Sequence, residues 1–194
     1  PDPDEKSTIE SVLIYVKQHD LLSKWKYGFH GIKPRIGAMI VGSGFAFGPE
    51  YRRPDLAKGN ISFRATTQVS THWYQLYETE LAFPRLANDR AFINLDARYR
   101  DYSRLMYYGP GPDSKKTGRS DYRLEDTRAG FSAGFTPVRP FSFGVRGNYL
   151  AVNIGPGKYP GVISTDRQYS EAQTPGIQQQ TDFLQGGVFA AYDT

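Results

Sequence analysis

Glu78 and Glu80 are the side chains whose type and spacing come closest to a catalytic arrangement. In an extended strand, residues two apart project from one face, and two neighbouring carboxylates could serve as the acid and base of a glycosidase. Three arginines, Arg64, Arg98 and Arg100, are expected on neighbouring strands. We therefore interpret the two glutamates as charges that these arginines balance.

Other catalytic and metal-binding arrangements are missing from the sequence. The chain has no cysteine, which excludes disulfide scaffolds, thiolate metal sites and cysteine nucleophiles. Its three histidines do not have the spacing of metal ligands. The segment Gly42-Ser43-Gly44 lacks the flanking residues of a G-x-S-x-G nucleophile elbow. We predict that the protein is not an enzyme and has no catalytic residue, no metal site and no cofactor.

Charge and hydropathy argue against two further classes of protein. Lys and Arg total 24 and Asp and Glu total 20, but the two signs alternate along the chain, so we expect no nucleic-acid partner. No stretch approaches the ~18 uncharged apolar residues of a membrane-spanning helix. With 20 Gly, 13 Pro and 14% aromatic residues, the composition favours strands and turns.

Alternation with a period of two begins at Arg35 and predicts an all-β, antiparallel fold. It is clearest over residues 91–100, where Ile93 and Leu95 share the apolar face and Asn94 and Asp96 share the polar face. We predict about seven strands of roughly ten to thirteen residues, against ~5–6 for a typical soluble strand. Such strands are long enough to cross a bilayer, which needs ~9–11 residues.

The predicted connections alternate between short and long. The short ones are residues 53–60, 84–89 and 136–140, and the long ones are residues 102–120 and 153–180. Antiparallel pairing then places the short turns at one end and the long loops at the other. This is the layout of an outer-membrane barrel, although a lipocalin-like soluble barrel can share it.

The alternation alone does not decide which face meets water. Aromatic residues near strand ends and charges of both signs on the polar face favour a membrane barrel with its polar face inward. The predicted lumen-facing polar residues are Arg64, Glu78, Glu80, Asn94, Asp96, Arg98, Arg100 and Arg146.

We predict two parts in the chain. Residues 1–34 form a short helix and a linker, and residues 35–194 form an outer-membrane β-barrel segment. Ser7 and Glu10 have the spacing of a capping box at the start of a helix over residues 7–25. It could pack on its own domain, plug the barrel or act as a periplasmic connector. We expect both chain ends to be cuts in a longer protein.

Short motifs over residues 35–194 resemble the bacterial surface-antigen family of outer-membrane barrels, the BamA/TamA type. The loop after Tyr107-Tyr108 resembles a loop of that family, and residues 56–60 and 81–90 resemble its first periplasmic turns. Gly42-Ser43-Gly44-Phe45 with Gly48 resembles its glycine-rich first barrel strand. The family barrel has roughly sixteen strands. The resemblance therefore implies an incomplete half, open at residues 37–48 and 182–192.

The resemblance implies a non-enzymatic role in assembly, insertion or export of outer-membrane proteins. Gly42, Gly44 and Gly48 would form a gate strand that opens laterally onto client proteins. The sequence Val145-Arg146-Gly147 is similar to the family's functional arginine motif, but Asn148 follows it in a strand context, so no role is carried over. The segment before the barrel is too short for a periplasmic domain, which weighs against insertase activity.

The expected location is the bacterial outer membrane, and the expected partners are the lipid bilayer, lipopolysaccharide and client outer-membrane proteins. Lys115, Lys116 and Arg119, in a long loop, would face acidic lipopolysaccharide. Two other functions stay open: a soluble or surface β-barrel that binds a ligand inside, and a hydrolase in a barrel lumen.

Overall fold

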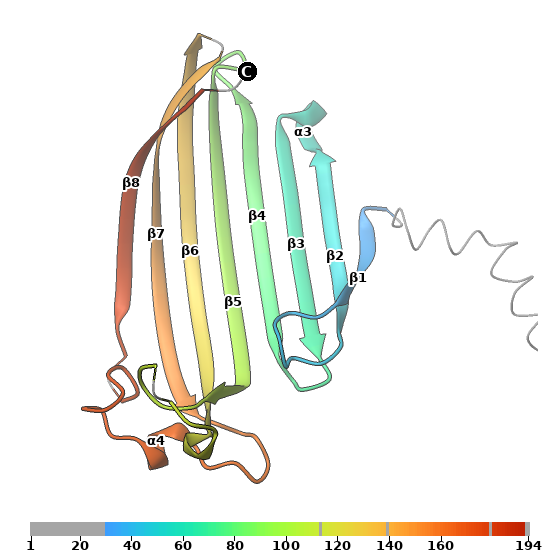
Figure 1. Cartoon of the computed structure of the whole chain (residues 1–194). Helices are drawn as coiled ribbons and strands as arrows, with labels where there is room; N and C mark the ends of the chain where they lie inside the picture. The colour runs from blue at the N-terminus through green and yellow to red at the C-terminus, as the bar shows by residue number, and fades with distance from the viewer. Residues whose placement is uncertain (1–29, 113, 139, 179, 193–194) are drawn as a thin grey trace, which may run out of the picture.

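The computed structural model describes residues 30–112, 114–138, 140–178 and 180–192, which form a single antiparallel sheet (Figure 1). The strands are β1 (Ile32–Gly37), β2 (Ala46–Asp55), β3 (Ile61–Ser70), β4 (Gln75–Leu86), β5 (Ala91–Tyr107), β6 (Ser120–Val138), β7 (Phe141–Pro156) and β8 (Asp182–Tyr192). Each strand pairs with the next one in the chain. The all-β antiparallel prediction is confirmed.

The sheet is not closed into a barrel. It has eight strands, not about seven, and β1 and β8 are its two edges, with no described residue paired on their outer sides. The strand predicted over residues 36–48 is wrong, because β1 ends at Gly37, a loop follows, and β2 begins at Ala46. The predicted open edge at residues 37–48 is therefore β1 instead, while the edge at residues 182–192 is β8.

The two long loops lie at one end of the sheet, as the sequence predicts, but the short β3–β4 turn over residues 71–74 lies at that end as well, so the segregation by length is incomplete. The turns β2–β3, β4–β5 and β6–β7 lie at one end of the sheet, and the longer loops β5–β6 and β7–β8 lie at the other (Figure 1). The helical pieces in the described part of the chain are short: α3 (Leu56–Gly59), α4 (Thr165–Gln168) and the 3-10 turn η1 (Lys116–Gly118). The helix predicted over residues 7–25 lies outside the described residues.

The face of the sheet that carries Arg35, Glu78 and Phe92 is concave. Arg35 of β1 reaches Glu78 of β4, with 3.9 Å between Nη1 and Oε2, across the two intervening strands. The rings of Phe92 on β5 and Phe189 on β8 lie 6.3 Å apart, again with two strands between them. In a flat sheet, strands three places apart are separated by about 14 Å, at ~4.8 Å per strand. Side chains from such strands meet only on the concave face of a curved sheet.

Candidate functional site

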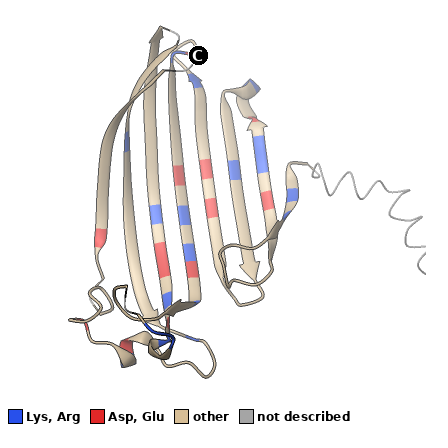
Figure 2. Ribbon diagram, in the orientation of Figure 1, with Lys and Arg blue, Asp and Glu red and all other residues tan. Residues whose placement is uncertain are grey.

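The eight polar residues singled out in the sequence all lie on the concave face. Residues directly opposite each other in the ladder lie on the same face of the sheet. Arg64 is opposite Glu80, and Glu78 is opposite Arg98. Ser132 is opposite both Asn94 and Arg146. Figure 2 marks the positions of charged residues along β2 to β6, from both faces of the sheet. We call the concave face the charged face.

One group of ion pairs joins β1 to β4. Glu50 binds Lys33 at 3.0 Å and Arg35 at 3.6 Å, and Arg64 donates to Glu80 at 2.7 Å. With Arg35 also near Glu78, these pairs cross four strands. Both glutamates of the possible two-carboxylate pair are thus engaged by arginines.

A second group of ion pairs surrounds Asp126 on β6. This aspartate is 3% exposed and accepts from Arg100 Nε at 2.7 Å and from Arg98 Nη2 at 3.5 Å. The expectation that Arg98 and Arg100 balance the two glutamates is therefore wrong, since their partner is the buried carboxylate on β6. On the same strands, Arg128 lies 3.6 Å from Asp96.

Basic side chains outnumber acidic ones on the charged face. The basic residues are Lys33, Arg35, Arg52, Arg64, Arg98, Arg100, Arg128 and Arg146, and the acidic residues are Glu50, Glu78, Glu80, Asp96 and Asp126. Three like-charged pairs lie directly opposite in the ladder on this face: Arg52 with Arg64, Arg98 with Arg128, and the two carboxylates of Glu80 and Asp96. Such pairs are destabilising unless other charges compensate them.

The surplus of positive charge is concentrated around a hollow of about 780 Å³ in the charged face, over β5 to β8. Its lining includes Arg98, Arg128 and Arg146 but only one carboxylate, that of Asp96. Arg146 is exposed and has no carboxylate within ion-pair distance among the described residues.

The opposite, convex face is apolar and exposed. Large side chains that project from it into the surroundings are Leu95, Phe131, Phe135, Phe141, Phe143, Val145, Leu184 and Val188. The buried apolar residues in the described chain are few and include Tyr74, Leu76 and Tyr102. The apolar sides of these strands therefore form an outer surface instead of a core.

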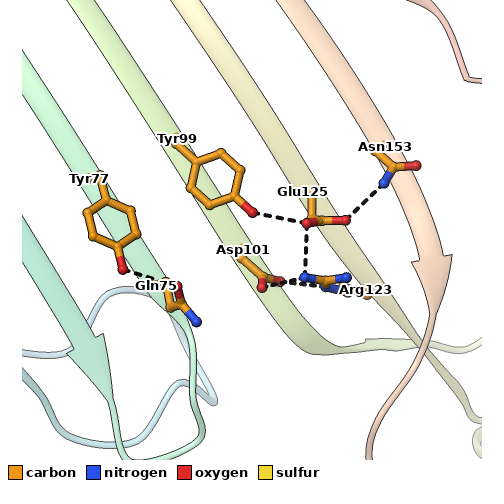
Figure 3. A network of polar contacts seen from close by, with 7 residues as sticks. All are labelled: Gln75, Tyr77, Tyr99, Asp101, Arg123, Glu125 and Asn153. Carbon is orange, nitrogen blue, oxygen red and sulfur yellow. Dashed lines mark hydrogen bonds and ion pairs between the residues drawn. The ribbon is translucent and has the colours of Figure 1, made fainter.

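A row of tyrosines ends the apolar face on the side of the long loops. The hydroxyl of Tyr77 donates to Gln75 at 3.1 Å, the hydroxyl of Tyr99 donates to Glu125 at 2.9 Å, and the hydroxyl of Tyr149 donates to Asp182. The first two pairs are drawn in Figure 3. Each ring thus extends the apolar face while its hydroxyl reaches a polar side chain closer to the loops.

These polar partners belong to a polar belt on the convex face, defined by Gln75, Asp101, Arg123, Glu125, Asn153 and Asp182. Figure 3 shows all of them except Asp182. Arg123 donates to both carboxylate oxygens of Asp101, at 2.8 and 2.7 Å, and lies 2.9 Å from Glu125. The belt was not predicted from the sequence. A signal for it exists: Asp101 and Glu125 are acidic at positions where the alternation calls for apolar residues.

The predicted gate glycines do not share a strand. Gly42 and Gly44 lie in the loop between β1 and β2, both with positive φ, at 84° and 71°. Gly48 lies in β2, which is paired on both sides, and a Cβ there would approach the carbonyl oxygen of Thr67 to 1.8 Å. The structure thus assigns Gly48 a close contact with β3, not an edge.

The long loops cover the adjoining strand ends with a small buried layer. Ser120 and Asp121 are fully buried; Ser120 Oγ lies 2.9 Å from Thr165 Oγ1, and Asp121 accepts from the Tyr159 N–H at 2.6 Å. Burial also raises the pKa of Tyr74 above its ordinary value. On the outside, the Arg119 guanidinium lies 5.4 Å from the centre of the Tyr159 ring.

No family profile, curated protein or solved structure matches this chain. Within the described residues, no helix is long and apolar enough to cross a membrane, and no group of three or more potential metal ligands is present.

Proposed function

We propose that the chain is a lipid-spanning segment of an outer-membrane barrel, with its convex face toward lipid and its charged face toward water. The observation that carries this proposal is the inverted burial: Leu95 is 42% exposed, whereas Asp126 on the charged face is 3% exposed. In a soluble barrel the apolar face points inward. This contrast favours the membrane over the soluble ligand-binding alternative.

The dimensions of the apolar face also support the proposal. On β7 it runs from Tyr149 to Phe141, about 27 Å of strand at ~3.4 Å per residue. A tilt of ~40° reduces this to about 21 Å, to which the terminal aromatic rings add, compared with the ~25 Å apolar band of outer-membrane barrels. The tyrosine row and the polar belt would then lie at the level of the lipid headgroups.

Within this proposal, the long loops face outward and the short turns face the periplasm. Lys115, Lys116 and Arg119 would then contact the phosphates of lipopolysaccharide. The role in assembly, insertion or export of outer-membrane proteins, implied by the family resemblance, is part of the proposal. The outer edge of β1 supports it, because it pairs with no described residue and an open strand edge can template an incoming strand.

Extraction and gel migration test the membrane proposal. We expect the chain to require detergent for solubility and to migrate differently on a denaturing gel before and after heating, as folded membrane barrels do. Free solubility without detergent, with identical migration of heated and unheated samples, would contradict the proposal.

The assembly role needs a separate experiment. Liposomes that contain the chain should take up an unfolded outer-membrane protein faster than empty liposomes. Equal insertion rates would remove the assembly role while leaving the membrane proposal intact.

A further inference from the structure

We infer that the hollow of about 780 Å³ in the charged face binds an acidic peptide segment, with Arg146 as its principal contact. The inference rests on the proposed function, in which the charged face is exposed to water. It adds the chemical class of a peptide that would bind there. The volume of the hollow falls within the ~300–1,000 Å³ of typical binding pockets.

The arginines of the hollow have unused capacity for hydrogen bonds. Arg146 lacks a carboxylate partner in the described chain, and the Nε of Arg98 is buried without a hydrogen-bond partner there. A guanidinium group presents five N–H donors in a fork that matches a carboxylate. A bound carboxylate would pair with the Arg146 donors for which the described residues offer no carboxylate.

The Arg146 side chain lies against a glycine on the neighbouring strand. Gly187 lies opposite Arg146 in the ladder, and a Cβ on it would be 3.5 Å from the Arg146 Nε. This distance is an ordinary van der Waals contact, so Arg146 lies alongside β8 at the level of Gly187. Nearby, Asn148 donates to Gln185 at 3.1 Å, which leaves the amide N–H groups of Gln185 available to a ligand.

Electrostatics within the hollow favour a negative ligand. Arg98 and Arg128 face each other directly across β5 and β6, and Asp126, the main partner of Arg98, is shared with Arg100. Asp96 is the single carboxylate of the lining and already lies near Arg128. An added anion would offset the repulsion between the two arginines.

The lining favours a peptide over a free inorganic anion. Leu150 and Phe189 line the same hollow as the arginines, so apolar contacts lie beside the charged ones. A segment in which acidic residues alternate with apolar residues would use both kinds of contact. Inorganic phosphate would use only the arginines.

Binding can be measured by fluorescence anisotropy on the full chain folded in detergent micelles. The probe is a labelled peptide of alternating glutamate and leucine, and the same peptide with glutamine in place of glutamate is its control. We expect saturable binding of the first peptide and none of the second. Arg146→Gln should weaken binding about tenfold, because a charge-assisted hydrogen bond is lost.

Arg52→Gln is the matched control, because it removes the same charge from the charged face outside the hollow. It should change the affinity less than twofold. Equal losses in the two variants would show non-specific attraction and overturn the inference, as would binding of the glutamine peptide or displacement of the probe by equimolar inorganic phosphate. If the heat-dependent gel migration is present and the probe does not bind, the inference fails while the membrane proposal stands.

Discussion

Adjacent residues in one strand of this sheet meet different surroundings. On β5, Leu95 projects outward from the convex face, while Asn94 points to the charged face and donates to Ser132 at 3.3 Å. If the convex face contacts lipid, these two positions should respond differently to the same substitution.

Leu95→Arg is expected to destabilise the folded protein in lipid by about 2–4 kcal/mol, because it places a charge on the lipid face near the middle of the bilayer. Asn94→Arg, the matched control, should cost less than ~1 kcal/mol. Urea unfolding in lipid vesicles, followed by tryptophan fluorescence, measures both. A cost for Asn94→Arg equal to that of Leu95→Arg would contradict the assignment of the faces.

At the residue scale, the sequence predicts the two faces well where the alternation is regular. It fails at Phe92, which breaks the pattern and lies on the concave face, where it packs toward Phe189 and above Gly134. It also fails for Asp101 and Glu125, because their place on the convex face depends on Arg123, a partner on a neighbouring strand. Alternation along one strand carries no information on such partners.

At the scale of elements, the β2–β3 pair depends on a close approach of two backbones. A Cβ at Gly48 would meet the carbonyl oxygen of Thr67 at 1.8 Å and the Cα of Gln68 at 2.9 Å. In contrast, a Cβ at Gly186 on β8 would meet nothing within 4 Å.

Gly48→Ala should therefore lower the free energy of unfolding by about 1–3 kcal/mol, the usual cost of overpacking. Gly186→Ala should leave it unchanged or raise it by less than ~1 kcal/mol, because it reduces the freedom of the unfolded chain. Samples of each variant are heated to increasing temperatures and run on a gel. The temperature at which the band of the folded protein disappears measures the difference in stability between the two variants. Equal temperatures for both variants would show that β2 and β3 do not approach so closely.

The division of the segment 36–48 into β1, a loop and β2 could not be predicted from the sequence. Its glycines and apolar residues fit either a single strand with a bend or two strands with a loop. The choice depends on pairing: Gly37 lies opposite Ala46, so the chain must reverse between them. The placement of the two long loops at one end was predictable, because alternate connections of an antiparallel meander lie at the same end.

At the scale of the whole molecule, the two ends of the sheet should face opposite sides of the membrane. The chain has no cysteine, so single cysteines can be introduced by Ser114→Cys in the β5–β6 loop and Asn60→Cys in the β2–β3 turn. Both positions are exposed. A membrane-impermeant maleimide added to intact cells should label the first variant and spare the second, and the reverse pattern would show an inverted orientation.

The central claim is that the convex face of the sheet contacts lipid and the charged face contacts water. Spin labels placed one at a time on residues 93–98, with the protein in lipid vesicles, test it most directly. We expect collisions with oxygen, which concentrates in lipid, to dominate at Ile93, Leu95 and Ala97, and collisions with a water-soluble nickel chelate to dominate at the residues between them. If labels at Leu95 and Asp96 were equally accessible to the nickel chelate, the convex face would be in water and the account would be wrong.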